Sequence, residues 1–136
     1  MSEKVQGYLK KEGIEFQCTV GYAPQQNGIA ERKNRSLVEA ARTMRSESGL
    51  SKCWWAEAVN TANYIQNRLI SQATNTTPFE KLFGKAPNLT DVHKFGADVF
   101  CKIPDVKRQK LDDKAIKMKF LGYDMNSKGY RLGGQK

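Results

Sequence analysis

The chain has 136 residues, enough for one ordinary domain or two small ones, and its 39% hydrophobic and 27% charged content indicates a chain that folds in water. Its 23 Lys and Arg exceed its 14 Asp and Glu, and the net charge of +9 favours a polyanionic partner, although a merely soluble basic protein is an equal alternative on charge alone. No apolar run is long enough to span a membrane, the first residues lack the hydrophobic core of a secretory signal, and three scattered cysteines fit free thiols in a reducing compartment.

The first quarter of the chain predicts a helix, a strand and a turn. Residues 3–12 carry apolar side chains at helical spacing and are followed by Gly13, which ends a helix well. Residues 14–20 alternate as a strand, in which Cys18 is expected to be a small core residue. Residues 21–28 contain a Pro and an Asn-Gly pair, and they predict a turn.

A long helix is predicted over residues 29–48, with Gly49 at its C-cap. At about 100° per residue, one side carries an acid among basic residues: Glu31, Arg35, Arg42 and Arg45. The opposite side is an apolar stripe suited to a core: Ile29, Ala30, Leu37, Ala40, Ala41 and Met44. From spacing alone, the favoured interpretation of Glu31 is a first-turn acid stabilised by the helix dipole and paired with Arg35.

A second helix is predicted over residues 52–69, and its apolar side consists of Trp55, Ala58, Val59, Ala62, Ile65 and Leu69. Trp54 and Trp55 are neighbours, so they point about 100° apart, and we expect one in the core and the other partly exposed. Packing in a core or a dimer is a commoner use of such a tryptophan than stacking on a nucleobase, which stays an alternative.

The rest of the chain changes from helical to strand periodicity. Asn75 to Pro78 predict the start of a short helix that ends at Phe83, and residues 84–91 resemble a linker. From Phe95 onward the apolar residues alternate, which predicts strands around 99–103 and 116–121 and a hairpin turn at 126–129. Cys101 is expected in the core of this part. Residues 94–136 hold 11 Lys and Arg against 5 Asp and Glu, a net charge of +6.

Several segments, in the same order, resemble one known family. The run Pro-Gln-Gln-Asn-Gly-Ile-Ala-Glu-Arg-Lys-Asn at 24–34 resembles the third-carboxylate segment of retroviral and retrotransposon integrases, the copia type above all. Residues 50–58, with adjacent tryptophans before Ala-Glu-Ala, resemble the next helix of that family, and residues 77–87 resemble its connecting segment. Phe95-Gly96 and the Lys-Phe-Leu-Gly-Tyr run at 119–123 resemble its small β domain.

The resemblance implies an α+β chain that contains only part of the integrase fold. Residues 1–72 are expected to be the C-terminal part of a ribonuclease-H-like catalytic core, mostly helical here. Residues 73–93 would be a short helix and linker, and residues 94–136 a partial SH3-like β-barrel. With few strands to cover the helices' apolar stripes, we expect marginal stability and self-association.

The resemblance also assigns roles to single residues. Glu31 corresponds to the third metal-binding carboxylate, Asn27 lies in the loop that touches DNA, and Asn34 and Arg35 lie where the family contacts DNA. Arg42 and Arg45 extend that basic face. In the family two Asp residues and one Glu hold two Mg²⁺ or Mn²⁺ ions, and the positions of both Asp residues fall before Met1.

This donor set leads to an expectation about catalysis. Glu31 alone cannot hold two divalent ions, because each ion needs several oxygen ligands. Asp112-Asp113 lies in a polar segment that predicts a turn and is no substitute. His93, the single histidine, is expected to be a surface or structural residue. The chain alone is therefore expected to bind nucleic acid weakly, hold no metal and catalyse nothing.

Two other interpretations stay open. One is a non-catalytic module, derived from the mobile element, that binds nucleic acid or a protein partner. The other is a decayed gene fragment that does not fold stably. The family's integrases act on chromosomal DNA, so the resemblance implies the nucleus as the place of action and DNA, not a membrane, as the partner.

Overall fold

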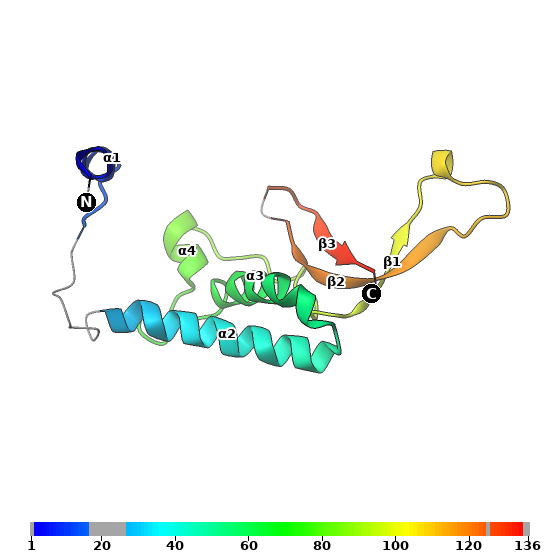
Figure 1. Cartoon of the computed structure of the whole chain (residues 1–136), viewed down its shortest axis with the longest axis horizontal. Coiled ribbons are helices and arrows are strands. Elements are labelled where there is room, and N and C mark those ends of the chain that lie inside the picture. The colour runs from blue at the N-terminus through cyan, green and yellow to red at the C-terminus, as the bar shows by residue number, and fades with distance from the viewer. Residues whose placement is uncertain (1, 17–26, 125, 135–136) are drawn as a thin grey trace. The chain divides into compact units, whose positions relative to one another are not determined.

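The computed structural model describes residues 2–16, 27–124 and 126–134 (Figure 1). The contacts within the chain form two compact units, Met1–Asn34 and Arg35–Lys136. No helix in the described part is both long and apolar enough to cross a membrane. The domain boundaries predicted from the sequence, after residues 72 and 93, follow the domains of the resembled family and not these contact units. They stay a prediction.

The first unit contains helix α1, Glu3–Lys11, which agrees with the helix predicted over residues 3–12. Glu3 in its first turn and two lysines in its last turn suit the helix dipole, and Gly13 follows with a φ of 66°. Residues 14–16 of the predicted strand have no regular secondary structure. The rest of that strand, Cys18 and most of the predicted turn lie outside the described residues.

Helix α2, Gly28–Ser48, begins in the first unit and continues in the second, which confirms the predicted long helix. Gly49 ends it with a φ of 66°, a left-handed conformation that favours glycine. The predicted apolar stripe is covered only in part. Ala41 is buried and Met44 packs against the core, whereas Ile29 is 81% exposed.

The predicted second helix is shorter and less regular than expected. It begins as a 3₁₀ turn, η2, Lys52–Trp54, and continues as α3, Trp55–Gln66. The helix ends early, and the backbone N–H groups of Arg68 and Leu69 form tight i to i+3 bonds to Ile65 and Gln66. Trp54 packs against the core and Trp55 is 65% exposed, which confirms the expectation that one of the two tryptophans lies in the core and the other is partly exposed.

Helix α4, Pro78–Phe83, matches its prediction closely. The Thr77 hydroxyl accepts a hydrogen bond of 3.0 Å from the backbone N–H of Glu80, and Pro78 occupies the first helical position. Gly84 ends the helix with a φ of 68°. Side-chain capping at one end and glycine at the other explain why this short helix was predictable from sequence.

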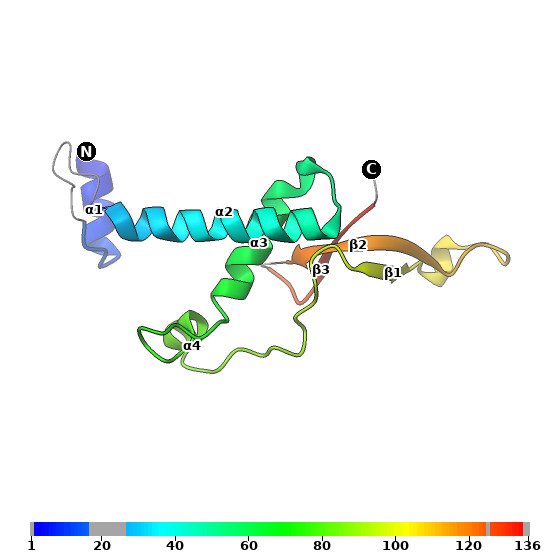
Figure 2. The same cartoon turned by 90° about the horizontal axis from the view of Figure 1, so that it is seen from below.

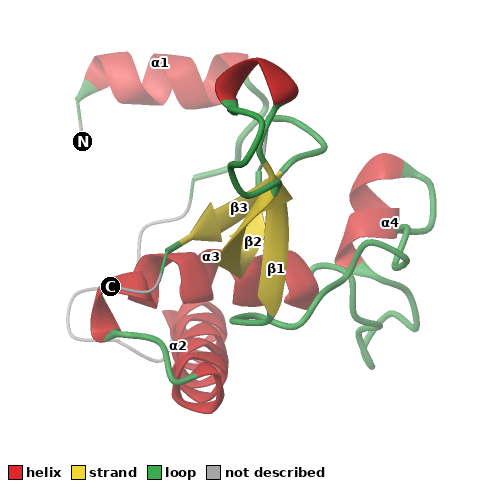
Figure 3. Cartoon of the chain, turned by 90° about the vertical axis from the view of Figure 1, so that its right-hand side faces the viewer, coloured by secondary structure: helices red, strands yellow, loops and turns green. Residues whose placement is uncertain are grey.

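The C-terminal part forms a three-stranded antiparallel sheet in the order β1-β2-β3 (Figure 3). The strands are β1, Asp98–Lys102, β2, Ala115–Tyr123, and β3, Tyr130–Gly133, and a 3₁₀ turn, η3, Asp105–Lys107, follows β1. The predicted hairpin turn joins β2 to β3, where the N–H of Asp124 donates to the carbonyl of Gly129 at 3.0 Å. Helices together with this sheet confirm the α+β class.

Among the described elements, helices cover one end of the sheet and leave the other open. A bulge between Phe120 and Gly122 breaks the strict alternation of β2, so Phe120 and Leu121 are both buried. Farther along, Ile116 is 55% exposed, and Cys101 on β1 is exposed as well. The prediction of Cys101 as a core residue was wrong, because nothing in the described part of the chain covers that end of the sheet.

One core joins the helices to the sheet. Helix α3 crosses α2 (Figure 2), and the Gln66 amide donates to the Ser36 hydroxyl at 3.0 Å. The buried cluster is Ala41, Leu50, Ala58, Phe95 and Leu121, with Met44, Trp54 and Val59 packed against it. These residues come from α2, α3 and the β part, so the second unit is a single packed body.

Candidate functional site

Three of the predicted site residues lie in the first unit, around the start of α2. Asn27 immediately precedes the helix, Glu31 is in its first turn and Asn34 one turn later, and all three are exposed. A carboxylate in the first turn is favoured by the helix dipole. Glu31 forms no ion pair with any residue that the structure describes, so its predicted pairing with Arg35 is absent there.

A metal site cannot be assembled from the described side chains. No group of three or more His, Cys, Asp and Glu residues lies together among them. Glu31 offers one carboxylate, whereas Mg²⁺ and Mn²⁺ prefer several oxygen ligands, so this donor set does not fit such an ion. Asp112 serves a turn, since its carboxylate accepts a 2.7 Å hydrogen bond from the backbone N–H of Gln109, which agrees with the turn predicted there.

The predicted basic residues Arg35, Arg42 and Arg45 lie in the second unit, on the part of α2 that packs against α3. Arg35 and Arg42 are exposed and Arg45 is half-buried. In the described part of the chain no carboxylate forms an ion pair with any of the three guanidinium groups. The structure thus leaves three cations on one stretch of helix available to an anion.

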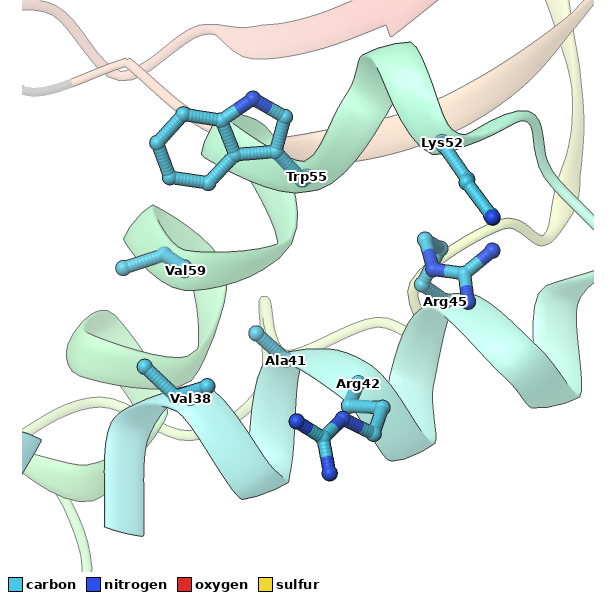
Figure 4. A pocket seen from close by; sticks show the side chains of 7 residues that line it. All are labelled: Val38, Ala41, Arg42, Arg45, Lys52, Trp55 and Val59. Carbon is cyan, nitrogen blue, oxygen red and sulfur yellow. The ribbon is translucent and has the colours of Figure 1, made fainter. Parts of the chain in front are cut away.

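Arg42 and Arg45 also line a hollow of about 440 Å³ between α2 and α3, here named the α2–α3 groove (Figure 4). Its apolar lining consists of Val38, Ala41, Trp55 and Val59. Its charged lining consists of Arg42, Arg45 and Lys52, all cations. Lys52 and Arg45 gather toward one end of the hollow, and Trp55, Val59 and Val38 toward the other (Figure 4). A volume of this size is within the range of ligand-binding hollows.

Sequence reasoning found the α2 half of this groove and missed the α3 half. Lys52 received no role, and the sequence left open which of the two tryptophans is exposed. The 100° between adjacent helical residues already indicated that the two tryptophans cannot both face one core. Once Trp54 is placed in the core, Trp55 must turn toward α2 and solvent, where the arginines lie.

The sheet is fixed to α3 by one well-formed ion pair. The Arg131 guanidinium on β3 donates twice to the Glu57 carboxylate, at 2.8 Å from Nε and 2.5 Å from Nη2. These hydrogen bonds raise the pKa of Arg131 above its ordinary value, with the charge of Glu57 acting in the same direction. The pair ties the β part to the helix that lines the groove.

An aromatic cluster holds the connecting segment against α3 and the sheet. The rings of Tyr64 and Tyr123 stack with centroids 3.8 Å apart, and burial raises the pKa of Tyr123 above its ordinary value. The His93 backbone N–H donates to the Tyr123 hydroxyl at 2.9 Å, and the His93 ring lies edge-on to the ring of Phe120. The interpretation of His93 as a structural residue agrees with these contacts.

Comparison with known proteins identifies the class of the β part. Residues 97–133 match the family model of the retroviral polymerase SH3-like domain. The sheet β1-β2-β3 lies within this range, so the SH3-like part of the sequence resemblance is confirmed. No solved structure matches the chain.

Relatives match nearly the whole chain. The Retrovirus-related Pol polyprotein from transposon TNT 1-94 of Nicotiana tabacum is 39% identical over 132 residues, which make up 96% of this chain and 10% of that protein. The corresponding protein from transposon RE2 of Arabidopsis thaliana is 34% identical over 124 residues, 90% of this chain and 8% of that protein. The Pol polyprotein of Feline endogenous virus ECE1 is 30% identical over 90 residues, 66% of this chain and 8% of that protein.

These matches define the family. The chain is homologous, over nearly its full length, to a segment of the Pol polyproteins of copia-type retrotransposons. It spans about a tenth of the length of these curated relatives.

Proposed function

We propose that this chain is a DNA-binding segment of a retrotransposon integrase. In this proposal residues 1–72 are the C-terminal part of a ribonuclease-H-like catalytic core, and the SH3-like domain follows it. The complete parent protein would be a metal-dependent polynucleotidyl transferase that joins the DNA of the element to target DNA, and it would act in the nucleus. Glu31 would supply the third metal-binding carboxylate of the intact core.

The cationic stretch of α2 carries the proposal. Arg35, Arg42 and Arg45 have no ion-pair partner among the described residues, and the chain as a whole has a net charge of +9. Arginine side chains with free guanidinium groups bind phosphates well, because their donors match the phosphate oxygens. The homology to Pol polyproteins makes DNA the first polyanion to test.

The test is binding to a fluorescein-labelled duplex, measured by fluorescence anisotropy over a series of salt concentrations. We expect affinity to fall with salt. The triple variant Arg35→Ala, Arg42→Ala and Arg45→Ala should reduce the salt slope by about 0.9 for each phosphate that it no longer neutralises. Binding equal to that of the parent at every salt concentration would remove the α2 face from the proposal.

A matched control removes the same charge elsewhere. Lys107, Lys110 and Lys114 are exposed in the connection between β1 and β2 and form no ion pair with described residues. Replacing these three with Ala should change affinity less than the α2 variant does. An equal or larger loss of affinity in the control would place DNA binding on the SH3-like part, where residues 94–136 carry a net charge of +6.

Catalysis by this chain alone is a separate part of the proposal. Because Glu31 is a single carboxylate without described partners, we expect no strand transfer and no cleavage of labelled duplex in Mg²⁺ or Mn²⁺. Glu31→Gln should leave DNA affinity nearly unchanged. Metal-dependent cleavage by the parent chain that disappears in Glu31→Gln would contradict this expectation.

Self-association is the last part of the proposal. Large apolar side chains are exposed on several elements, among them Ile29, Leu82 and Phe100, and β1 and β3 are open edges of the described sheet. We expect sedimentation velocity to show concentration-dependent species larger than the monomer. A single monomeric species at all concentrations would contradict it.

A further inference from the structure

The α2–α3 groove combines two features, of which a binding site for duplex DNA needs only the second. One is an apolar lining that includes an exposed indole, Trp55, which is 65% exposed. The other is a charged lining composed of cations alone. A duplex presents phosphates to a protein surface but keeps its base faces stacked inside, so the indole and the valines would have no partner in it.

We propose that this groove binds an unpaired stretch of nucleic acid. One base stacks on Trp55 and contacts the apolar side chains of Val38 and Val59, while flanking phosphates lie on Arg42, Arg45 and Lys52. The inference rests on the proposed nucleic-acid binding and assigns it a substrate form, a single strand or a frayed end. Stacking on aromatic rings beside a positive groove is the general chemistry of single-strand recognition.

Charge decides between this occupant and a second copy of the chain. A symmetric dimer through the groove would bring Arg42, Arg45 and Lys52 close to their own counterparts. Like charges at an interface oppose association, whereas phosphates supply the missing opposite charge. An acidic amphipathic peptide would also match the charge, and it enters the test as a competitor. An exposed aromatic ring beside cations is the combination that binds single-stranded nucleic acid.

The experiment compares a labelled oligothymidylate of roughly 12 nucleotides with a blunt hairpin duplex, because known single-strand sites span roughly 4–16 nucleotides. We expect Trp55→Ala to weaken binding of the oligothymidylate about tenfold and of the duplex little. Trp55→Phe should restore most of the affinity because it keeps an aromatic ring. The matched control is Phe100→Ala on β1, a 73% exposed aromatic residue outside the groove, which should change neither affinity.

A spectroscopic measurement reports contact at the indole itself. Binding of the oligothymidylate should quench tryptophan emission, and the quenching should nearly disappear in Trp55→Phe although binding persists. Trp54, which is packed against the core, provides the emission that remains.

The outcomes separate the inference from the function on which it rests. Absence of both oligothymidylate and duplex binding in the parent chain would overturn the proposed function. Normal duplex binding, with an unchanged ratio of the two affinities in Trp55→Ala, would overturn the groove inference alone. Stronger displacement of the oligothymidylate by a Glu- and Leu-containing amphipathic peptide than by unlabelled oligothymidylate, or a dimer that depends on Trp55, would overturn it as well.

Discussion

The two sides of helix α3 differ in how deeply their side chains are buried and in whether their polar groups have partners. Toward the sheet, Ala58 is 0% exposed and belongs to the same buried cluster as Leu121 of β2, and Thr61 is 1% exposed and lies close to Gly122 of β2. Toward α2, Trp55 and the neighbouring cations face the groove and solvent. The first side is buried against the sheet, and the second is the groove that we propose binds nucleic acid.

Hydrogen bonding shows the same difference. The Thr61 hydroxyl donates to the carbonyl of Leu121 at 2.9 Å in the interior, and Glu57 holds Arg131 at the edge of that contact. Across the helix, Arg42, Arg45 and Lys52 form no ion pair with described residues. Substitutions on the sheet side should therefore change stability, and those on the groove side should change binding.

The largest effect is expected at Gly122, where β2 crosses α3. Its φ of 145° suits glycine, and an added Cβ would lie 2.5 Å from the Thr61 hydroxyl oxygen. Gly122→Ala should lower the free energy of unfolding by about 3 kcal/mol, measured by urea denaturation, through strain and overpacking together. Gly134→Ala is the control, since no described residue lies within 4 Å of its added Cβ, and equal stability of the two variants would contradict the close contact.

The next effect concerns the buried hydroxyl itself. Thr61→Val keeps the shape of the side chain but leaves the Leu121 carbonyl without its donor, which should cost about 1–2 kcal/mol in urea unfolding. Thr43→Val removes a similar hydroxyl from an exposed position on α2, where it donates to the Glu39 carbonyl. This control should change stability by less than about 0.5 kcal/mol. A Thr61→Val variant as stable as the parent would show that water or a rearranged backbone replaces the bond.

A smaller effect is expected from the Glu57–Arg131 pair. The Glu57 side chain is 15% exposed and that of Arg131 is 52% exposed, so solvent screens the pair in part. A double-mutant cycle with Glu57→Gln and Arg131→Gln should give a coupling of about 0.5–1 kcal/mol that shrinks with salt. A coupling of zero at low salt would mean that the pair does not fasten β3 to α3.

The groove cations should have still less influence on stability. Arg45→Gln with Lys52→Gln should change the free energy of unfolding by less than about 0.5 kcal/mol, because neither residue has a described ion-pair partner to lose. The same variant should bind oligothymidylate more weakly. A clear decrease in stability with unchanged binding would contradict the claim that substitutions on the groove side change binding and not stability.

The sequence predicted those elements whose local signals agree with the fold. The cap at Thr77, the terminator Gly49 and the alternation of the strands are local features, and the helices and the sheet follow them. The burial of a side chain depends on which segment covers that face of the helix or strand, and the periodicity of the sequence does not show this. For that reason Cys101 was placed in a core that does not extend to it, and Leu69, on the predicted apolar side of the second helix, is 57% exposed.

The candidate site was predictable to a similar extent. The position of Arg42 and Arg45 on one side of α2 was predictable from helical spacing, because both residues belong to the same helix. Lys52 and Trp55 join them only through the packing of α3 on α2, a contact between segments that no local pattern encodes. The roles of Asn27, Glu31 and Asn34 rest on the family resemblance and stay predictions.

The smallest effect is expected at Asp98, the first residue of β1, which belongs to neither side of α3. Its carboxylate lies 2.7 Å from the Lys119 ammonium and 3.0 Å from that of Lys117, and these hydrogen bonds lower its pKa below the ordinary 3.8. The pKa of Asp98 is lower in the folded chain than in the unfolded chain, so its charged carboxylate stabilises the fold above about pH 5. This stabilisation disappears as the pH falls through 3.8, the ordinary value, and then through the lowered value. Urea midpoints measured from neutral to acid pH should therefore fall less steeply in Asp98→Asn than in the parent. Asp113→Asn, at an exposed position without an ion pair to described residues, should keep the parent's slope. Parallel curves for Asp98→Asn and the parent would mean that the lysines beside Asp98 do not hold its charge in the folded state.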